Sequence, residues 1–316
     1  MENYPKILAE FESQFTTEEV CRDYLFKLRW PKGFRCPRCG HEKAWSVGTV
    51  LYQCGHCNYQ MSVIAGTIFQ DTHKPLTLWF RAIWWLTGQT NGASALGMKK
   101  ILGLGSYRTA WVWLHKLRRA MVSPGREKLF DEVEVDEIYI GRKRSGKRSR
   151  ETAGKALVII AAEDRGVGFG RIRLRHIPDA SNKTLNKFIK DSIKKGSTVK
   201  TDAWCGYKDI SSLGYRHVIT NQQSIIGENP SPHIQRVGSL LKLWLLGIHQ
   251  GAVSHEHLDY YLDEYTFRVN CRTLTDRGKL FYQVLQNAVQ IEPAPFGKIA
   301  RHVRGRKSKE YNAVLP

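Results

Sequence analysis

From residue 131 onward the apolar positions follow the pattern of short β-strands. Three segments are rich in β-forming residues and are separated by polar or turn-forming stretches: 132–140 (EVEVDEIYI), 156–162 (ALVIIAA) and 171–176. The segment 198–201 is a further short strand. Before it we expect a helix that Ser181 caps and Gly196 ends, with one apolar face made of Leu185, Phe188, Ile189 and Ile193. The pattern therefore predicts an α/β domain in which three strands, a helix and a fourth strand follow one another.

The preceding part of the chain has helical periodicity. Residues 75–86 begin with Pro75, which suits a first helical turn, and carry apolar side chains at helical spacing: Leu76, Trp79, Phe80, Ile83 and Trp84. After a short segment at 94–100 and a glycine-containing turn, Ser106 is expected to cap a second helix with an apolar stripe of Ala110, Leu114, Leu117 and Met121. Its other side is basic and carries Arg108, Lys116, Arg118 and Arg119. This outline predicts a helix-turn-helix that binds DNA, and the alternative is a helical pair with a solvated basic face.

The composition favours a nucleic-acid partner. At 316 residues with 42% hydrophobic side chains, the chain can bury a substantial core and suggests two or three domains. Lys and Arg outnumber Asp and Glu by 49 to 29, and the net charge of +20 favours a polyanion. The longest apolar run, near 82–86, is far shorter than the roughly 20 residues that cross a bilayer. Because the first residues also lack an apolar signal segment, we expect no membrane partner and a cytoplasmic, nucleoid-associated protein.

Four of the seven cysteines form two CxxC motifs separated by fourteen residues: Cys36, Cys39, Cys54 and Cys57. Gly or Pro accompanies both motifs, and the spacing is close to that of a ribbon with a structural, tetrahedral Zn²⁺. Strand-forming residues lie between the motifs. The alternatives are buried or redox cysteines, or replacement of one thiolate by His41 or His56. We favour four sulfur ligands.

Two aspartates occupy informative positions in the α/β domain. Asp136 interrupts the centre of the first strand, and Asp202 follows the fourth. A carboxylate in a buried strand is costly unless it is paired or binds a cation. The order of elements resembles that of an RNase H-like fold, in which the first and fourth strands are neighbours, so the two carboxylates could meet and hold a pair of Mg²⁺ ions. The alternative is a salt-bridged surface residue and a turn former.

The loop after the first strand is basic and contains Gly and Ser. We expect it to grip DNA phosphates through Arg142, Lys143, Arg144, Lys147, Arg148 and Arg150.

The whole chain resembles the small bacterial insertion-sequence transposases that carry an N-terminal zinc ribbon and a DDE-type catalytic domain (ISXO-like). The matching stretches span roughly residues 29–272 and include RWPKGFRCPRCG, YQCGHCNYQMSVIAGTIFQDTHKPLTLWF, TAWVWLHKLRRAM, VDEIYIG, TDAWCGY and SLLKLWLLGIHQGAVSHEHLDYYLDEYTFRVNCR. The resemblance implies nicking at element ends and strand transfer by a homo-oligomer on double-stranded DNA, both element ends and target. The domains would be a zinc ribbon (1–70), a helix-turn-helix-like segment (71–125), an RNase H-like catalytic domain (126–275) and a basic C-terminal helix and tail (276–316).

Carried over by motif, the resemblance makes Asp136 in VDEIYIG and Asp202 in TDAWCGY the first two catalytic residues, with Mg²⁺ or Mn²⁺ as the catalytic metal. Lys242 in SLLKLW matches a Lys that follows the third catalytic residue by seven positions. Counting back seven gives Gln235, where the family usually has Glu, Asn or His. At about 100° per residue, Gln235 shares a helix face with Lys242, whereas His233 lies on the opposite face. Glu228 and His233 remain alternatives for the third ligand.

Two other functions compete with transposition. Gln235 has no charge and favours a decayed or host-recruited DNA-binding protein without catalysis. A nuclease or junction resolvase on the same fold would have no need for the ribbon and the helix-turn-helix.

Overall fold

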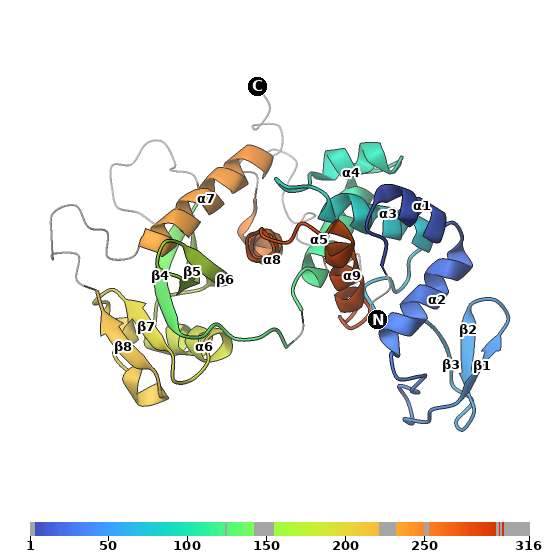
Figure 1. Ribbon diagram of the computed structural model, residues 1–316, viewed down its shortest axis with the longest axis horizontal. Coiled ribbons are helices and arrows are strands. Elements are labelled where there is room, and N and C mark those ends of the chain that lie inside the picture. The colour runs from blue at the N-terminus through green and yellow to red at the C-terminus, as the bar shows by residue number, and fades with distance from the viewer. Residues whose placement is uncertain are drawn as a thin grey trace. The chain divides into compact units, whose positions relative to one another are not determined.

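The structure, a computed structural model, describes residues 4–123, 125–141, 155–220, 232–249 and 253–294, together with Gly297 and Ile299. The chain divides into two compact units. The first comprises Met1–Pro124 and Leu274–Pro316, and the second comprises Gly125–Thr273 (Figure 1). The residues predicted to grip phosphates after the first strand lie outside the described part: Arg142, Lys143, Arg144, Lys147, Arg148 and Arg150.

The first unit is mainly helical. Its helices are α1 (Leu8–Gln14), α2 (Glu18–Arg29), α3 (Leu76–Thr87), α4 (Ala95–Ile101), α5 (Tyr107–Ala120) and α9 (Arg277–Ala288). The side chain of Thr17 caps α2, and that of Ser94 caps α4. The Glu18 carboxylate accepts the free backbone N–H groups of Leu76 and Thr77 at 2.8 Å each, so α2 also caps α3.

Helix α9 belongs to the first unit although it follows the whole second unit in sequence. Its Phe281 is fully buried and contacts the aromatic rings of Phe11, Phe15, Phe80 and Trp84. These rings come from α1, α3 and the segment between α1 and α2. Aromatic packing therefore joins both ends of the chain in one core.

The predicted helices at 75–86 and after Ser106 are present as α3 and α5, and the predicted apolar stripe of α5 is buried. The prediction that its basic side chains share a solvent-facing side was wrong for two of them. Lys116 is buried, and Arg118 is only 1% exposed, with its guanidinium donating to the carbonyl of Ala93 at 3.3 Å. Arg108 and Arg119 are half-buried. The long aliphatic stems of Lys and Arg allow this, because they pack like apolar side chains while the head finds a polar partner.

The first unit also contains a three-stranded antiparallel sheet in the order β1-β2-β3. Its strands are β1 (Ala44–Val47), β2 (Leu51–Cys54) and β3 (Gln60–Ser62). The hairpin of β1 and β2 lies between the two CxxC motifs, as the strand-forming residues there predict.

The second unit is built on a five-stranded mixed sheet in the order β6-β5-β4-β7-β8. Its strands are β4 (Glu132–Ile140), β5 (Ala156–Asp164), β6 (Phe169–Ile177), β7 (Thr198–Thr201) and β8 (Arg216–Ile219). Strands β4, β5 and β6 are antiparallel, whereas β4 pairs with β7, and β7 with β8, in parallel. The first and fourth strands are therefore neighbours, as the RNase H-like order predicts.

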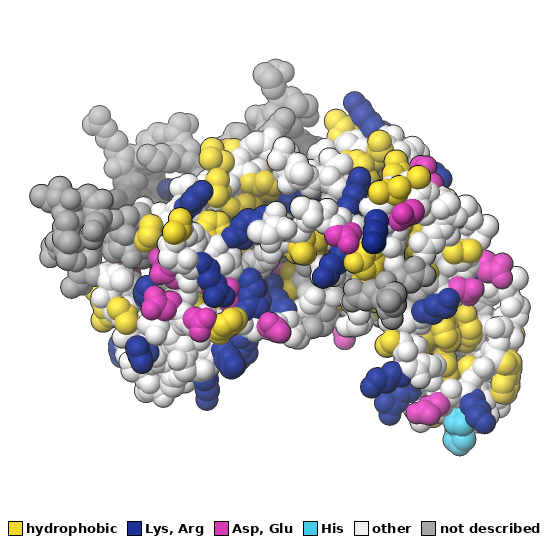
Figure 2. Space-filling view, viewed as in Figure 1, with side chains coloured by type: hydrophobic (Ala, Val, Ile, Leu, Met, Phe, Trp, Pro, Cys, Tyr) yellow, Lys and Arg dark blue, Asp and Glu magenta, His cyan; other side chains and the backbone are white. Residues whose placement is uncertain are grey.

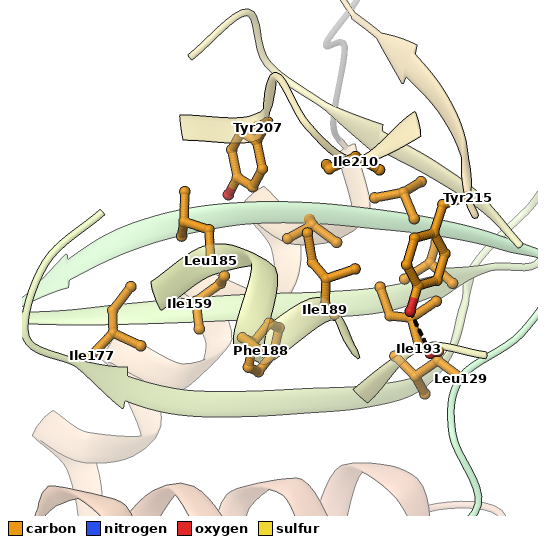
Figure 3. Packing of buried hydrophobic residues seen from close by; sticks show 14 residues of the cluster. Leu129, Ile159, Ile177, Leu185, Phe188, Ile189, Ile193, Tyr207, Ile210 and Tyr215 are labelled. Atoms are coloured by element: carbon orange, nitrogen blue, oxygen red, sulfur yellow. Dashed lines mark hydrogen bonds between the residues drawn. The ribbon is translucent and has the colours of Figure 1, made fainter. Parts of the chain in front are cut away.

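Helices cover both faces of this sheet. One face packs against α6 (Asn182–Ser192), and Figure 3 shows Leu185, Phe188 and Ile189 of this helix in the core. The other face packs against α7 (Pro232–His249) and α8 (Leu258–Asn270). Successive side chains of a strand point to opposite faces, so Val133 and Val135 of β4 face α6, and Ile138 faces α7. Among the residues that the structure describes, no helix is long and apolar enough to cross a membrane.

Candidate functional site

The four cysteines of the CxxC motifs converge at one point of the ribbon. Their sulfur atoms all lie within 4.8 Å of one another. The Sγ atoms of Cys36 and Cys57 are 3.7 Å apart, and those of Cys39 and Cys54 are 3.6 Å apart. Zn–S bonds of about 2.3 Å in a tetrahedron separate the sulfurs by about 3.8 Å. The cluster therefore has the dimensions of a four-thiolate zinc site.

The backbone of each motif turns tightly around its sulfurs. Gly40 and Asn58, the residues that directly follow the second cysteine of each motif, adopt φ of +77° and +55°. Their N–H groups donate to the carbonyls of Cys36 at 2.8 Å and Cys54 at 3.2 Å. The two motifs thus form matching knuckles, and Gly and Asn are the residues that tolerate this left-handed conformation best.

The electrostatics of the cluster favour a bound cation. Burial opposes ionisation of Cys54, but the backbone N–H groups of Cys57 and His56 lower its pKa to about 6. The N–H of His41 favours the thiolate of Cys39, yet burial and the neighbouring thiols raise its pKa to about 12. Four adjacent thiols therefore cannot all ionise unless a metal compensates their charge.

Exposed basic side chains surround the knuckles: Lys32, Arg35, Arg38 and Lys43. Figure 2 shows Lys and Arg side chains gathered at this end of the ribbon. Charges of this sign on an exposed surface favour contact with phosphate groups.

The register of the central strands brings Asp136 and Asp202 together. In the parallel pair of β4 and β7, Glu134 lies opposite Lys200. Asp136 is two residues beyond Glu134, and Asp202 is two residues beyond Lys200, so the aspartates reach the same level of neighbouring strands. Burial raises the pKa of Asp136, and the nearby charge of Asp202 raises it further, although the N–H of Glu137 lowers it. Two carboxylates that repel each other in a half-buried place are a donor set suited to hard divalent cations.

The TDAWCGY motif forms a compact turn after β7 that fixes Asp202. The carboxylate of Asp202 accepts the N–H of Trp204 at 3.1 Å, and the indole N–H of Trp204 donates to the carbonyl of Ala180 at 3.0 Å. Gly206 is packed so closely that an added Cβ would lie 2.8 Å from both the Ala180 carbonyl oxygen and the Leu185 side chain. The glycine therefore lets the turn approach the start of α6.

A third carboxylate near the aspartates was missed by sequence reasoning. Glu137 directly follows Asp136, and its Oε1 accepts the hydroxyl of Tyr207 at 2.6 Å. Burial, together with the charges of Asp136 and Asp202, raises the pKa of Glu137 to about 7, against the effect of the Tyr207 hydrogen bond. The signal available in the sequence was the unusual pair of adjacent acids in the middle of a strand.

Helix α7 is attached to β4 on both sides of Asp136. Glu134 accepts the N–H groups of the first turn of α7, and Gly238 lies where an added Cβ would be 3.3 Å from the Ile138 side chain. Gln235 belongs to the segment of α7 between these two contacts and is exposed. Lys242 is exposed two turns further along the same helix. Gln235 and Lys242 thus belong to one helix, as their predicted common helix face requires.

His233, the alternative third ligand, belongs to a separate cluster with Glu134 and Asp164, whose ligand atoms lie within 4.8 Å of one another. The donors of this cluster are already engaged. His233 Nε2 lies 3.1 Å from Asp164, whose other oxygen accepts the ammonium of Lys200 at 2.9 Å. A cation here would compete with Lys200 and with the His233–Asp164 contact, and the arrangement in the structure is a hydrogen-bonded network. Glu228, the other alternative, lies outside the described residues.

Comparison with known proteins agrees with this geometry. Residues 16–60 match the transposase zinc-ribbon domain, and residues 128–270 match the ISXO2-like transposase domain. A similar protein from Halobacterium salinarum, described as an uncharacterized protein in transposable element ISH50, is 26% identical over 282 residues, which are 80% of this chain and 91% of that protein. The two matched domains contain the four-cysteine cluster and the Asp136–Asp202 pair, and the chain belongs to the ISXO2-like DDE transposases that carry a zinc ribbon.

Proposed function

We propose that this chain binds the terminal inverted repeats of an insertion sequence as double-stranded DNA and catalyses cleavage at the element ends and strand transfer into target DNA. The observation that carries the proposal is the placement of Asp136 on β4 and of Asp202 directly after the neighbouring parallel strand β7, where their charges interact within a transposase domain. The proposal includes a homo-oligomer on DNA, because two ends must be joined to one target.

We assign a separate role in catalysis to each of four residues of the second unit. Asp136 and Asp202 would bind Mg²⁺ or Mn²⁺, and the amide oxygen of Gln235 would be a neutral third ligand. When bound, the metal pair polarises the scissile phosphate and activates water or a 3′-hydroxyl. The exposed ammonium of Lys242 is available to the DNA backbone.

The test separates DNA binding from catalysis. Asp202→Asn should retain end binding and abolish nicking and joining, because it removes one of two ligand charges and leaves the shape of the turn nearly unchanged. Asp209→Asn is the matched control, since Asp209 lies seven residues later in the same unit and outside the carboxylate pair. Full activity of Asp202→Asn would contradict the proposal.

A second candidate, a DNA-binding protein without catalysis, is favoured by Gln235. An amide neither neutralises two cations nor takes a proton, so both metal affinity and proton transfer are expected to be weak in this chain. Mn²⁺ accepts neutral ligands more readily than Mg²⁺ and should partly compensate. Gln235→Glu should therefore increase strand transfer, most clearly in Mg²⁺. Unchanged activity in Gln235→Glu, with loss in Glu228→Gln or His233→Ala, would move the third ligand away from position 235.

A further inference from the structure

The face of β4 opposite α7 carries a carboxylate that the proposed metal site does not use. Side chains alternate along the strand, so Glu137 lies on the α6 side with Val133 and Val135, whereas Asp136 lies on the α7 side. A carboxylate beside an apolar core needs a strong partner. Glu137 has one in the Tyr207 hydroxyl, which donates to its Oε1 at 2.6 Å.

Tyr207 ends the turn that begins with Asp202. Its ring is fully buried, and Figure 3 shows it projecting from its short 3₁₀ helix (η1, Cys205–Tyr207) toward the sheet, beside Leu185 and Ile210. The turn is held at two places. Trp204 and Gly206 fix it against the start of α6, and the Tyr207 hydroxyl fixes it to β4.

We infer that the hydrogen bond between Tyr207 and Glu137 is a positioning contact that sets the distance between Asp202 and Asp136. This inference rests on the proposed function, in which the aspartates bind the metal. Glu137 directly follows Asp136 in the chain. Tyr207 lies five residues after Asp202, in a turn that is held tightly by the contacts of Trp204 and Gly206. The negative charges of the two aspartates repel each other. Without the contact, this repulsion would move the turn away from β4 and widen the site.

The experiment compares two tyrosines of the same core. Tyr207→Phe removes only the hydroxyl that Glu137 accepts. Tyr215→Phe is the matched control, because Tyr215 is also buried in this core and its hydroxyl donates to the carbonyl of Ile193 at 3.2 Å (Figure 3). Each variant therefore loses one buried hydrogen bond. Glu137→Gln retains an acceptor oxygen for Tyr207 and is the conservative variant.

Two measurements are made on the full chain. The first, made without DNA, is the Mn²⁺ concentration that gives half of the maximal increase in unfolding temperature. The second is the Mn²⁺ concentration that gives half of the maximal rate of cleavage at element ends. Because a displacement of about 1 Å in a site can cost about a hundredfold in rate, we expect Tyr207→Phe to need at least about tenfold more Mn²⁺ in both. Tyr215→Phe and Glu137→Gln should need the same Mn²⁺ as the wild type within about threefold.

Each result decides between explanations. An unchanged Mn²⁺ requirement in Tyr207→Phe, or an equal increase in Tyr215→Phe, would overturn the inference, because the hydroxyl would then contribute stability alone. A loss in Glu137→Gln as large as in Asp202→Asn would also overturn it and make Glu137 a ligand. A normal Mn²⁺ response of Asp202→Asn would instead refute the proposed function, whatever Tyr207→Phe does. If the wild-type protein shows no response to Mn²⁺ in either measurement, both the proposed metal site and this inference are refuted.

Discussion

The carboxylate of Glu134 holds the first turn of α7, and its removal is expected to destabilise the second unit. Glu134 is 2% exposed, and a single oxygen, Oε2, accepts the buried N–H groups of His233 and Ile234 at 3.1 Å each. Glu134→Ala leaves both donors unsatisfied. A buried donor without a partner costs about 1 to 3 kcal/mol, so the variant should lose about 3 kcal/mol of unfolding free energy. For a unit of this size, that loss lowers the unfolding temperature by about 6 to 12 °C.

Two variants test the origin of this loss. Glu134→Gln keeps an oxygen that can accept both N–H groups, and burial raises the pKa of Glu134, which means that the site disfavours the charged form. We expect Glu134→Gln to lose less than about 1 kcal/mol. Glu132→Ala is the matched control on the same strand, because the Glu132 carboxylate is exposed and its ion pair with Lys200, at 2.6 Å, is expected to contribute about 1 kcal/mol or less.

The assay is urea unfolding of the full chain, followed by circular dichroism, with hydrogen exchange of the α7 amides as a local measurement. Exchange at the start of α7 should accelerate in Glu134→Ala and stay near the wild-type rate in the other two variants. The reasoning is refuted if Glu134→Ala is no less stable than Glu132→Ala. Equal losses in Glu134→Gln and Glu134→Ala would show that the charge matters and the shared oxygen does not.

Three further outcomes follow from the structure. Removal of zinc by a chelator, or Cys36→Ser, should unfold the ribbon and abolish end binding, and metal analysis of the purified chain should find about one Zn²⁺. Gly238→Val should move α7 away from Ile138 and reduce cleavage at least about tenfold, whereas Gly238→Ala requires a shift of only a few tenths of an ångström; retained cleavage in Gly238→Val would contradict this. Although burial opposes it, the hydrogen bond from Lys200 helps to lower the pKa of Asp164 to about 2 from its usual 3.8, so the stabilisation by the Asp164 carboxylate is present above pH 4 and is lost as the pH falls toward 2. Urea unfolding against pH should show this loss, about 1 kcal/mol after screening, and Asp164→Asn should not show it.

The sequence predicts the central strands well because burial on both faces determines their residues. Strands β4 and β7 have the predicted bounds. Strand β5 continues two residues past its predicted end, and β6 begins two residues earlier and ends one residue later than predicted. Strand β8 was not predicted, since three of its four residues are exposed and its sequence, Arg216–Ile219, has no apolar alternation. It forms because the outer edge of β7 has backbone N–H and C=O groups available for pairing. This pairing depends on the sheet as a whole and cannot be predicted from residues 216–219 alone.

Buried polar side chains were the main failure of sequence reasoning. Arg118 was predicted to belong to a DNA-binding face, and no role was predicted for Glu134 or Glu137. Each is stabilised by a partner from a distant part of the chain: the carbonyl of Ala93, the first turn of α7 and the hydroxyl of Tyr207. Periodicity records the side of an element on which a residue lies, and it contains no information on whether a distant donor or acceptor compensates its burial.

The position of Gln235 depends on the backbone of α7 more than on its own side chain. Glu134 fixes the start of this helix, and Gly238 allows its close approach to Ile138, so the anchors on both sides of Gln235 are made by other residues. These two anchors do not involve the side chain at position 235. For this reason we expect the anchors of α7 to remain in Gln235→Glu while the charge offered to a metal changes. Urea unfolding measured beside strand transfer then separates the chemistry of the third ligand from its placement.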